Sequence, residues 1–120
     1  MKLKSIVAAV AATCVLAAVT AAQTTHHTAE PKGDRSASSK AFAAANAKMH
    51  HDMDITFGGN SDVDFVKGMI PHHQGAIDMA KVVLTYGKDP AIRKLAEEIV
   101  KAQEAEIKMM QEWLAKNAKK

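Results

Sequence analysis

Two short breaks in this chain constrain its fold more than any other feature. The segments "FGGNSD", residues 57–62, and "GKDP", residues 87–90, interrupt stretches in which apolar residues recur every three or four positions. Gly87 fits the end of one helix, and Asp89 and Pro90 are typical of the start of the next. The pattern predicts helices from Ser39 to about Asp54, from a cap at Ser61 or Asp62 to about Tyr86, and from Pro90 to about Asn117.

The predicted fold class is all-α, an antiparallel three-helix hairpin or bundle in one domain, because no segment shows the alternation of a strand. Only about 80 residues are expected to be ordered, which makes a small core. Such a core would be completed by a metal or by a second copy, with dimerisation giving a four-helix or larger bundle.

Residues 1–22 have the pattern of a secretory signal peptide. Lys2 and Lys4 precede an apolar run from Ile6 to Val19, and cleavage is expected after Ala21 or Ala22. The run is shorter than the roughly 20 residues of a comfortable membrane span, so no stable span is expected in the mature form. An uncleaved anchor is the alternative. The expected location is the periplasm or the outside of the cell.

Residues 23–38 are expected to form a flexible leader, and residues 39–117 a helical metal-binding domain. The leader has no apolar periodicity, and its His26 and His27 belong either to a mobile tail or to an accessory metal contact. Lys2 and Lys4 leave with the signal peptide, so 14 of the 16 basic residues remain against 13 acidic ones, a net charge of +1. This balance does not suggest a nucleic-acid-binding protein.

The expected mature chain has no cysteine, because Cys14 lies in the signal peptide. Disulfides and thiolate metal sites are therefore excluded from it. Exported compartments are oxidising, so a protein that handles a soft metal there must use other donors. Methionine and histidine are available, since the whole chain has 7 Met and 6 His.

The stretch "KGMIPHHQGAIDMA", residues 67–80, places such donors on the apolar face of the middle helix. At about 100° per residue, His72 and His73 flank Met69, and Met79 lies two turns beyond His72 on the same edge. Pro71 lacks a backbone N–H. It either kinks this helix and aims the two histidines, or restarts a helix after a break.

The first helix carries a second group of donors in "MHHDM", residues 49–53. Met49 and Met53 are four residues apart and share a face, His50 lies beside that face, and His51 is expected to point to solvent.

The third helix contributes polar residues within an apolar stripe, namely Gln103 and Glu106, with Met110 one turn beyond. A carboxylate on an apolar face is costly unless it is paired. Glu106 therefore either orients a ligand histidine, contacts a metal directly, or reaches water or a lysine at the edge.

Thioether and imidazole groups form a soft donor set that suits copper, with Cu(I) favoured and Cu(II) as the second choice. Zinc usually takes cysteine, histidine or carboxylate, so the methionines argue against it. No serine lies near the histidine pair, and no Glu-x-x-His pair of a di-iron bundle is present, so no enzyme and no catalytic residue is predicted. The predicted metal ligands are Met49, His50, Met53, Met69, His72, His73 and Met79.

The segment "DVDFVKGMIPHHQGAIDMAK", residues 62–81, resembles the signature of domain-of-unknown-function family 305, the CopM-like proteins placed with ferritin-like helical bundles. The resemblance extends over "MHHDM" and over "DPAIRKLAEEIVKAQEAEIKMMQEWL", residues 89–114. It implies an exported, ferritin-like helical copper-binding protein linked to copper tolerance. The metal-associated positions that carry over are Met49, Met53, Met69, His72, His73 and Met79, with Gln103, Glu106 and Met110 facing the same site.

The function predicted from the sequence is sequestration or shuttling of copper by methionine and histidine side chains, with copper ions and a copper-handling protein as partners. The alternative is a helical interaction module whose Met-rich face packs on a partner or on a second copy, as a homodimer, without a physiological metal.

Overall fold

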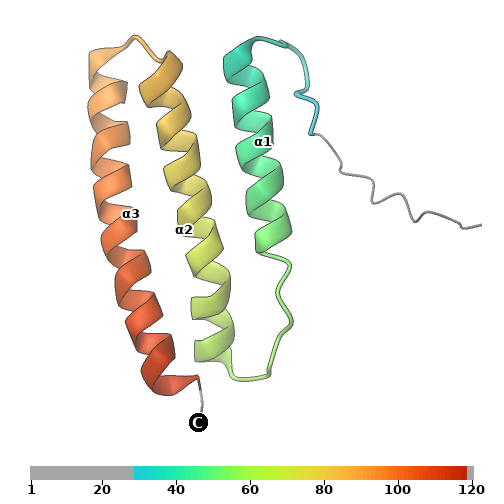
Figure 1. The fold of residues 1–120 in the computed structure, drawn as a ribbon, viewed down its shortest axis with the longest axis vertical. Coiled ribbons are helices and arrows are strands. Elements are labelled where there is room, and N and C mark those ends of the chain that lie inside the picture. Colours follow the sequence, from blue (N-terminus) through green and yellow to red (C-terminus); the bar gives the residue numbers. More distant parts are fainter. Residues whose placement is uncertain (1–28, 119–120) are drawn as a thin grey trace, which may run out of the picture.

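The computed structural model describes residues 29–118, so the expected signal peptide, His26 and His27 lie outside the described residues. Three antiparallel helices follow one another: α1 (Ala37–Asp52), α2 (Ser61–Tyr86) and α3 (Pro90–Asn117) (Figure 1). The prediction of an all-α, three-helix fold is confirmed. None of these helices is both long and apolar enough to cross a membrane.

The caps explain where the helices begin. α1 starts two residues before the predicted Ser39, because Ser36 caps it by accepting a hydrogen bond from the backbone N–H of Ser39 at 3.3 Å. The prediction of a cap at Ser61 or Asp62 for α2 is wrong. Asn60 is the cap, and its side-chain oxygen accepts from the N–H groups of Asp62 at 3.1 Å and Val63 at 3.2 Å.

The turn between α2 and α3 confirms the predicted start of α3. The carboxylate of Asp89 accepts from the backbone N–H groups of Ala91 and Ile92 at 2.9 and 3.0 Å, and Pro90 occupies the first turn. The guanidinium of Arg93 donates to the carbonyls of Leu84 and Gly87 at 2.8 and 3.1 Å. These hydrogen bonds connect the C-terminal end of α2 to the first turn of α3.

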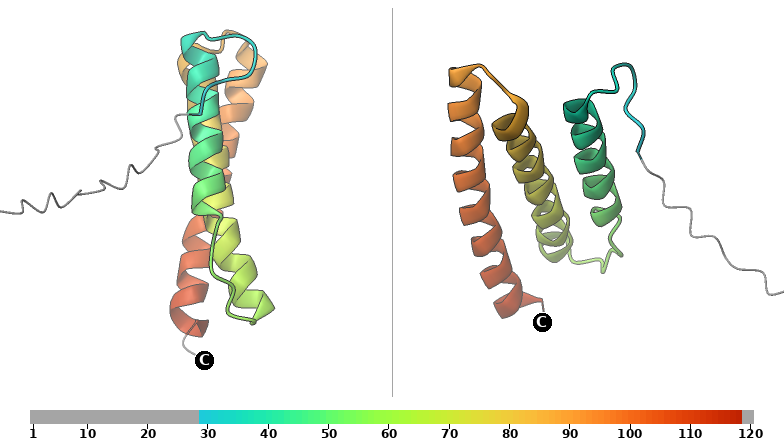
Figure 2. Two further views of the ribbon diagram at one scale, coloured as in Figure 1. Left: turned by 90° about the vertical axis from the view of Figure 1, so that its right-hand side faces the viewer. Right: turned by 45° about the horizontal axis from the view of Figure 1, so that its top comes forward.

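α2 lies between the other two helices, and the backbones of α1 and α3, both fully described, do not come close to each other (Figure 1). Two side-chain positions on α2 show that α1 and α3 pack on different sides of it. His73 bonds to Glu106 of α3, whereas Gly75 lies against Met49 of α1. At about 100° per residue these two positions are about 200° apart on the helix. The three helices therefore form a layer, seen edge-on in the left panel of Figure 2, whose lower turns diverge.

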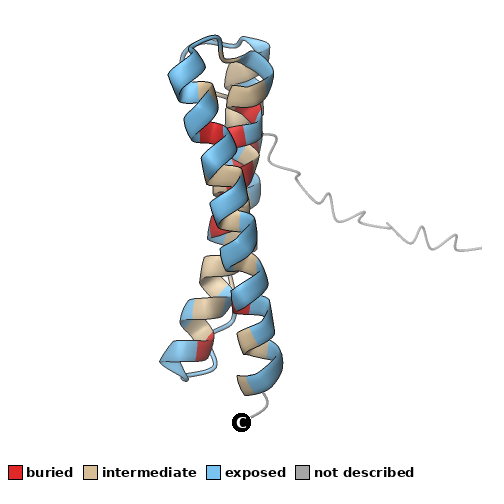
Figure 3. Cartoon of the chain, turned by 90° about the vertical axis from the view of Figure 1, so that its left-hand side faces the viewer, coloured by how far each residue is buried: buried red, intermediate tan, exposed pale blue. Residues whose placement is uncertain are grey.

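The layer has two unlike faces. One, here called the apolar face, carries the exposed side chains Phe65, Met79, Ile92, Leu95 and Met109. On α2, Phe65 falls about 160° away from Lys67, which lies on the opposite side. Buried residues are few, and Figure 3 shows most of the outer surface of α3 as exposed. The buried residues are Ala45, Val63, His73, Ile77, Ala80, Val82, Ala96 and Met110.

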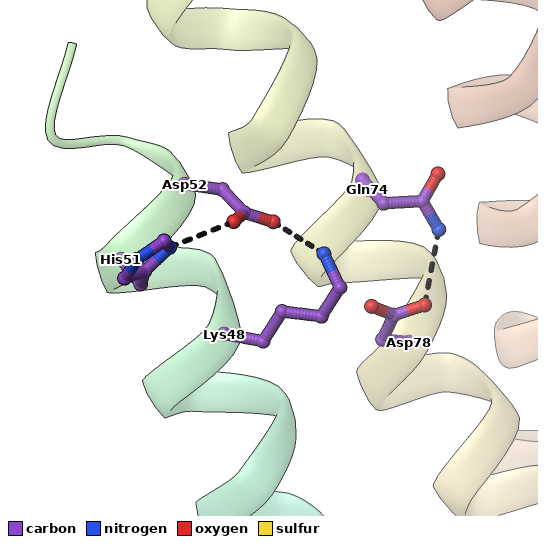
Figure 4. A network of polar contacts seen from close by, with 5 residues as sticks. All are labelled: Lys48, His51, Asp52, Gln74 and Asp78. Atoms are coloured by element: carbon purple, nitrogen blue, oxygen red, sulfur yellow. Dashed lines mark hydrogen bonds and ion pairs between the residues drawn. The ribbon is translucent and has the colours of Figure 1, made fainter. Parts of the chain in front are cut away.

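The opposite side, here called the polar face, holds a hydrogen-bonded network (Figure 4). The Lys48 ammonium pairs with the Asp52 carboxylate, which also lies 3.1 Å from Nδ1 of His51. These two contacts, that from Lys48 being the larger, lower the pKa of Asp52. On α2, Gln74 donates to Asp78 at 3.0 Å. His51 is exposed, as the sequence predicted.

Pro71 lies inside α2, and the helix continues through it from Ser61 to Tyr86. The structure therefore contradicts a restart of the helix after a break. Proline has no N–H to donate to the carbonyl four residues earlier, which is that of Lys67. That carbonyl belongs to an exposed residue and can be solvated.

Candidate metal centre

A pocket opens on the layer where the first half of α2 runs beside the second half of α3. Its volume is about 450 Å³, and its mouth lies on the apolar face next to Phe65 and Met109. The lining contains three thioethers, one imidazole, one carboxylate and an apolar wall. The lining residues are Phe65, Val66, Met69, His73, Glu106, Met109, Met110 and Trp113.

His73 is the most precisely held of these donors. It is only 8% exposed, its Nδ1 lies 2.8 Å from the carbonyl oxygen of Met69, and its Nε2 lies 2.6 Å from Oε2 of Glu106. A carbonyl oxygen can only accept a hydrogen bond, so Nδ1 carries a proton and donates it. The nitrogen that remains for other chemistry is Nε2, and it points into the pocket toward α3.

One proton must lie between Nε2 of His73 and the carboxyl group of Glu106. A neutral imidazole with its proton on Nδ1 and an ionised carboxylate are both acceptors at this contact, and two acceptors do not bond. Either His73 is an imidazolium or Glu106 is protonated. A metal ion that binds Nε2 must therefore displace this proton, and it frees the carboxylate either to move aside or to bind the ion as well.

The contact of Nδ1 with a backbone carbonyl is the arrangement by which metal-binding histidines are commonly fixed in one tautomer and one ring orientation. Glu106 has half of its side chain exposed, 53%, so it can move away from His73 without unpacking the core. Of the three options left open for Glu106, the structure shows it paired with a histidine.

The structure brings together four of the residues singled out from sequence, namely Met69, His73, Glu106 and Met110. It adds Met109, which the sequence analysis did not select. Met109 follows Glu106 by three residues, and helical spacing alone would have placed it beside that carboxylate. Gln103 is half-buried one turn before Glu106 and does not line the pocket.

The other residues predicted to bind metal lie elsewhere. His72 is exposed, and its ring centroid is 6.0 Å from that of His73. Met79 lines a separate cavity of about 280 Å³ with Phe42 and Leu95. His50 is exposed beside the leader, where Pro31 lies close to α1.

Met49 and Met53 lie at the end of α1. A Cβ atom placed on Gly75 would come within 2.8 Å of Cβ of Met49, which shows that the Met49 side chain packs directly on the backbone of α2. Met53 is half-buried, and its backbone N–H donates to the carbonyl of Met49 at 2.9 Å. The seven predicted ligands therefore do not form one cluster in this structure.

No group of three or more histidine, cysteine, aspartate or glutamate residues that could hold a metal occurs within residues 29–118. Hard or borderline ions that depend on such groups would find only His73 and Glu106 in the pocket. A soft ion would find three thioethers beside them. The donor set in this pocket therefore fits copper, and Cu(I) best.

Comparison with known proteins places the chain among relatives without an assigned activity. An uncharacterized protein of Acanthamoeba polyphaga mimivirus is 45% identical over 49 residues, which cover 41% of this chain and 32% of that protein. The chain thus matches about a third of the length of this curated relative. A family model described as "Domain of unknown function (DUF305)" matches residues 13–114. Because this match covers most of the sequence, including all of α1 and α2 and most of α3, the chain belongs to that family.

Proposed function

We propose that this protein is an exported copper-binding protein that sequesters or passes on Cu(I) and takes part in copper tolerance. The observation that carries the proposal is the pocket between α2 and α3, which Met69, Met109 and Met110 line together with His73 and Glu106. The proposal assigns the protein no catalytic reaction.

In this proposal His73 supplies the imidazole, and the methionines supply thioethers. Glu106 holds the imidazole in place in the metal-free protein and releases it when the ion binds. His72, exposed one residue away, is suited to receive or hand on the ion at the surface. Export is supported by the basic and apolar N-terminal segment, residues 1–22, and by the use of thioethers instead of thiols.

The test is an anaerobic competition titration in which the protein withdraws Cu(I) from a coloured chelator. We expect Met69→Leu and Met110→Leu each to weaken Cu(I) binding by at least about tenfold, since each removes a donor and keeps the side-chain volume. Binding should also weaken as the pH falls, because protons compete with the ion for the imidazole.

Met79→Leu is the matched control, because it makes the same chemical change in the separate cavity. It should leave Cu(I) binding unchanged. If the unsubstituted protein fails to withdraw Cu(I), the copper proposal is wrong. If Met79→Leu weakens binding as much as Met69→Leu, the site is not the pocket described above but the wider set of methionines predicted from the sequence.

A further inference from the structure

The apolar face is a continuous exposed patch of large apolar side chains. Its five large side chains are exposed by 63% (Phe65), 37% (Met79), 50% (Ile92), 49% (Leu95) and 58% (Met109). At about 200 Å² for a fully exposed large side chain, these five alone present roughly 500 Å². The largest apolar patch on a typical monomer is about 300–600 Å² and is often functional.

The face is continuous along both long helices. On α2 the positions of Phe65, Met69, Ala76 and Val83 lie within about 40° of one another, so they form one stripe. On α3, Ile92, Leu95 and Ile99 line the upper cavity, and Met109 and Trp113 line the lower pocket. Both hollows open along the groove between α2 and α3, and Phe42 of α1 also borders the upper one.

The charges on this face do not oppose its burial. Within the groove the acidic side chain is that of Glu106, and it is already paired with His73 at 2.6 Å. The exposed imidazole of His72 also lies on this face, about 20° from Phe65 on α2, and as a neutral imidazole it adds a polar but uncharged group. Lysines and carboxylates such as Lys67, Asp78 and Lys81 lie on the far side of α2. Two such faces can meet without leaving an unpaired charge between them, which would be strongly unfavourable.

Between the expected cleavage site and the described residues lies "QTTHHT", residues 23–28, which has no large apolar side chain. A second copy supplies an apolar groove of the same length and composition. Stable interfaces bury about 800 Å² per partner. The five side chains alone present roughly 500 Å² of this, and the half-buried Met69, Ile99 and Trp113 in the groove add to it.

We propose that the apolar face is the surface on which two copies of the chain associate, with their three-helix layers face to face. Such an interface is isologous, so each residue of the face meets the same face of its partner across a two-fold axis. The association does not depend on the proposed copper function, and it is tested in metal-free protein.

The experiment is sedimentation equilibrium of residues 23–120, which contain every described helix, in the presence of a chelator such as EDTA. We expect a dimer. Leu95→Glu, which places a carboxylate on the apolar face in the N-terminal half of α3, should weaken dimerisation by at least about tenfold while the far-ultraviolet circular dichroism stays helical. Met109→Gln, which removes apolar surface without adding charge, should weaken it less but in the same direction.

Ala105→Glu is the matched control. It introduces the same carboxylate on the same helix at an exposed position about 80° further from α2 than Leu95. It should leave dimerisation unchanged. A monomer at about 100 μM, far above the dissociation constant of a stable dimer, would overturn the proposal and assign the face to a partner of different sequence. Equal loss of dimerisation in Ala105→Glu and Leu95→Glu would overturn it as well.

Discussion

Gly75 sets how closely α1 approaches α2. Its position lies under the Met49 side chain, and a Cβ atom there would be 2.6 Å from Cγ and 2.8 Å from Cβ of Met49. Real side-chain carbons do not come this near, so only glycine lets the two helices pack at this distance. The same contact explains why Met49, predicted as a metal ligand, lies away from His73 and packs instead on the backbone of α2.

We expect Gly75→Ala to lower the free energy of unfolding by about 1–3 kcal/mol, because the new methyl group overpacks the contact with Met49. Chemical denaturation followed by circular dichroism measures this change. Met49→Ala in the same chain should recover part of the loss. Gly68→Ala is the control, since its Cβ would lie 3.8 Å from Cδ1 of Ile55, an ordinary contact. That variant should be neutral or more stable by up to about 1 kcal/mol, and a loss equal to that of Gly75→Ala would contradict the packing argument.

The helices follow from the sequence because their ends are set by neighbouring residues. Asp89 and Pro90 begin α3 where the sequence predicted, since cap and first turn are local chemistry. The cap of α2 was misplaced by one or two residues because Asn60, Ser61 and Asp62 can all cap a helix, and the sequence does not rank them. The site was only partly predictable. Periodicity gives the face of one helix, but which neighbour lies on which side of α2 depends on tertiary packing.

The carboxylate of Asp34 forms hydrogen bonds at the N-terminal end of α1, and these bonds depend on pH. Asp34 accepts from the backbone N–H of Ser36 at 3.0 Å and from the Ser39 hydroxyl at 2.6 Å. Hydrogen bonds from the side chains of Ser36 and Ser39 lower the pKa of Asp34 from 3.8 to about 2. The pKa of Asp34 is lower in the folded protein than in the unfolded chain. The hydrogen bonds to its ionised carboxylate therefore stabilise the start of α1 fully above about pH 4. This stabilisation is lost as the pH falls toward 2.

Carboxyl NMR titration should therefore give Asp34 a midpoint near 2, because its hydrogen bonds to Ser36 and Ser39 lower its pKa to about 2. In Ser39→Ala the midpoint should move up toward the ordinary value, because one of the bonds to the ionised form is gone. An Asp34 midpoint that does not change in Ser39→Ala would contradict the hydrogen bond from the Ser39 hydroxyl to the Asp34 carboxylate.

The whole molecule is a layer in which one helix has two neighbours and the others have one each. α1 packs on α2 alone, and the long helices α2 and α3 pack on each other along most of their length (Figure 1). Fewer buried contacts mean easier local opening, so stability should differ between the helices. The sequence predicted the three helices. It did not predict that only α2 packs on both of the others, because the apolar stripe of each helix does not identify its neighbour.

We expect amide hydrogen exchange followed by mass spectrometry to show α1, residues 37–52, exchanging before the paired middle parts of α2 and α3. Equal protection in all three helices would mean that the layer opens only as a unit. Repeating the measurement in Leu95→Glu tests whether the protection of α1 and that of α3 respond differently to the loss of apolar surface. Protection of α3 should fall if the apolar face is covered by a second copy, whereas α1 should change less because it lies on the other side of α2.

Met109 and Met110 are adjacent in the sequence but differ in access to solvent, at 58% and 5% exposed. In the monomer, where the apolar face is open to solvent, peroxide reaches an exposed sulfur more easily than a buried one, so Met109 should become a sulfoxide well before Met110. The added oxygen would turn an apolar side chain at the mouth of the pocket into a polar one. Oxidative damage would then begin at the rim of the candidate copper site, and it would be repairable there by sulfoxide reduction before the buried sulfur is touched.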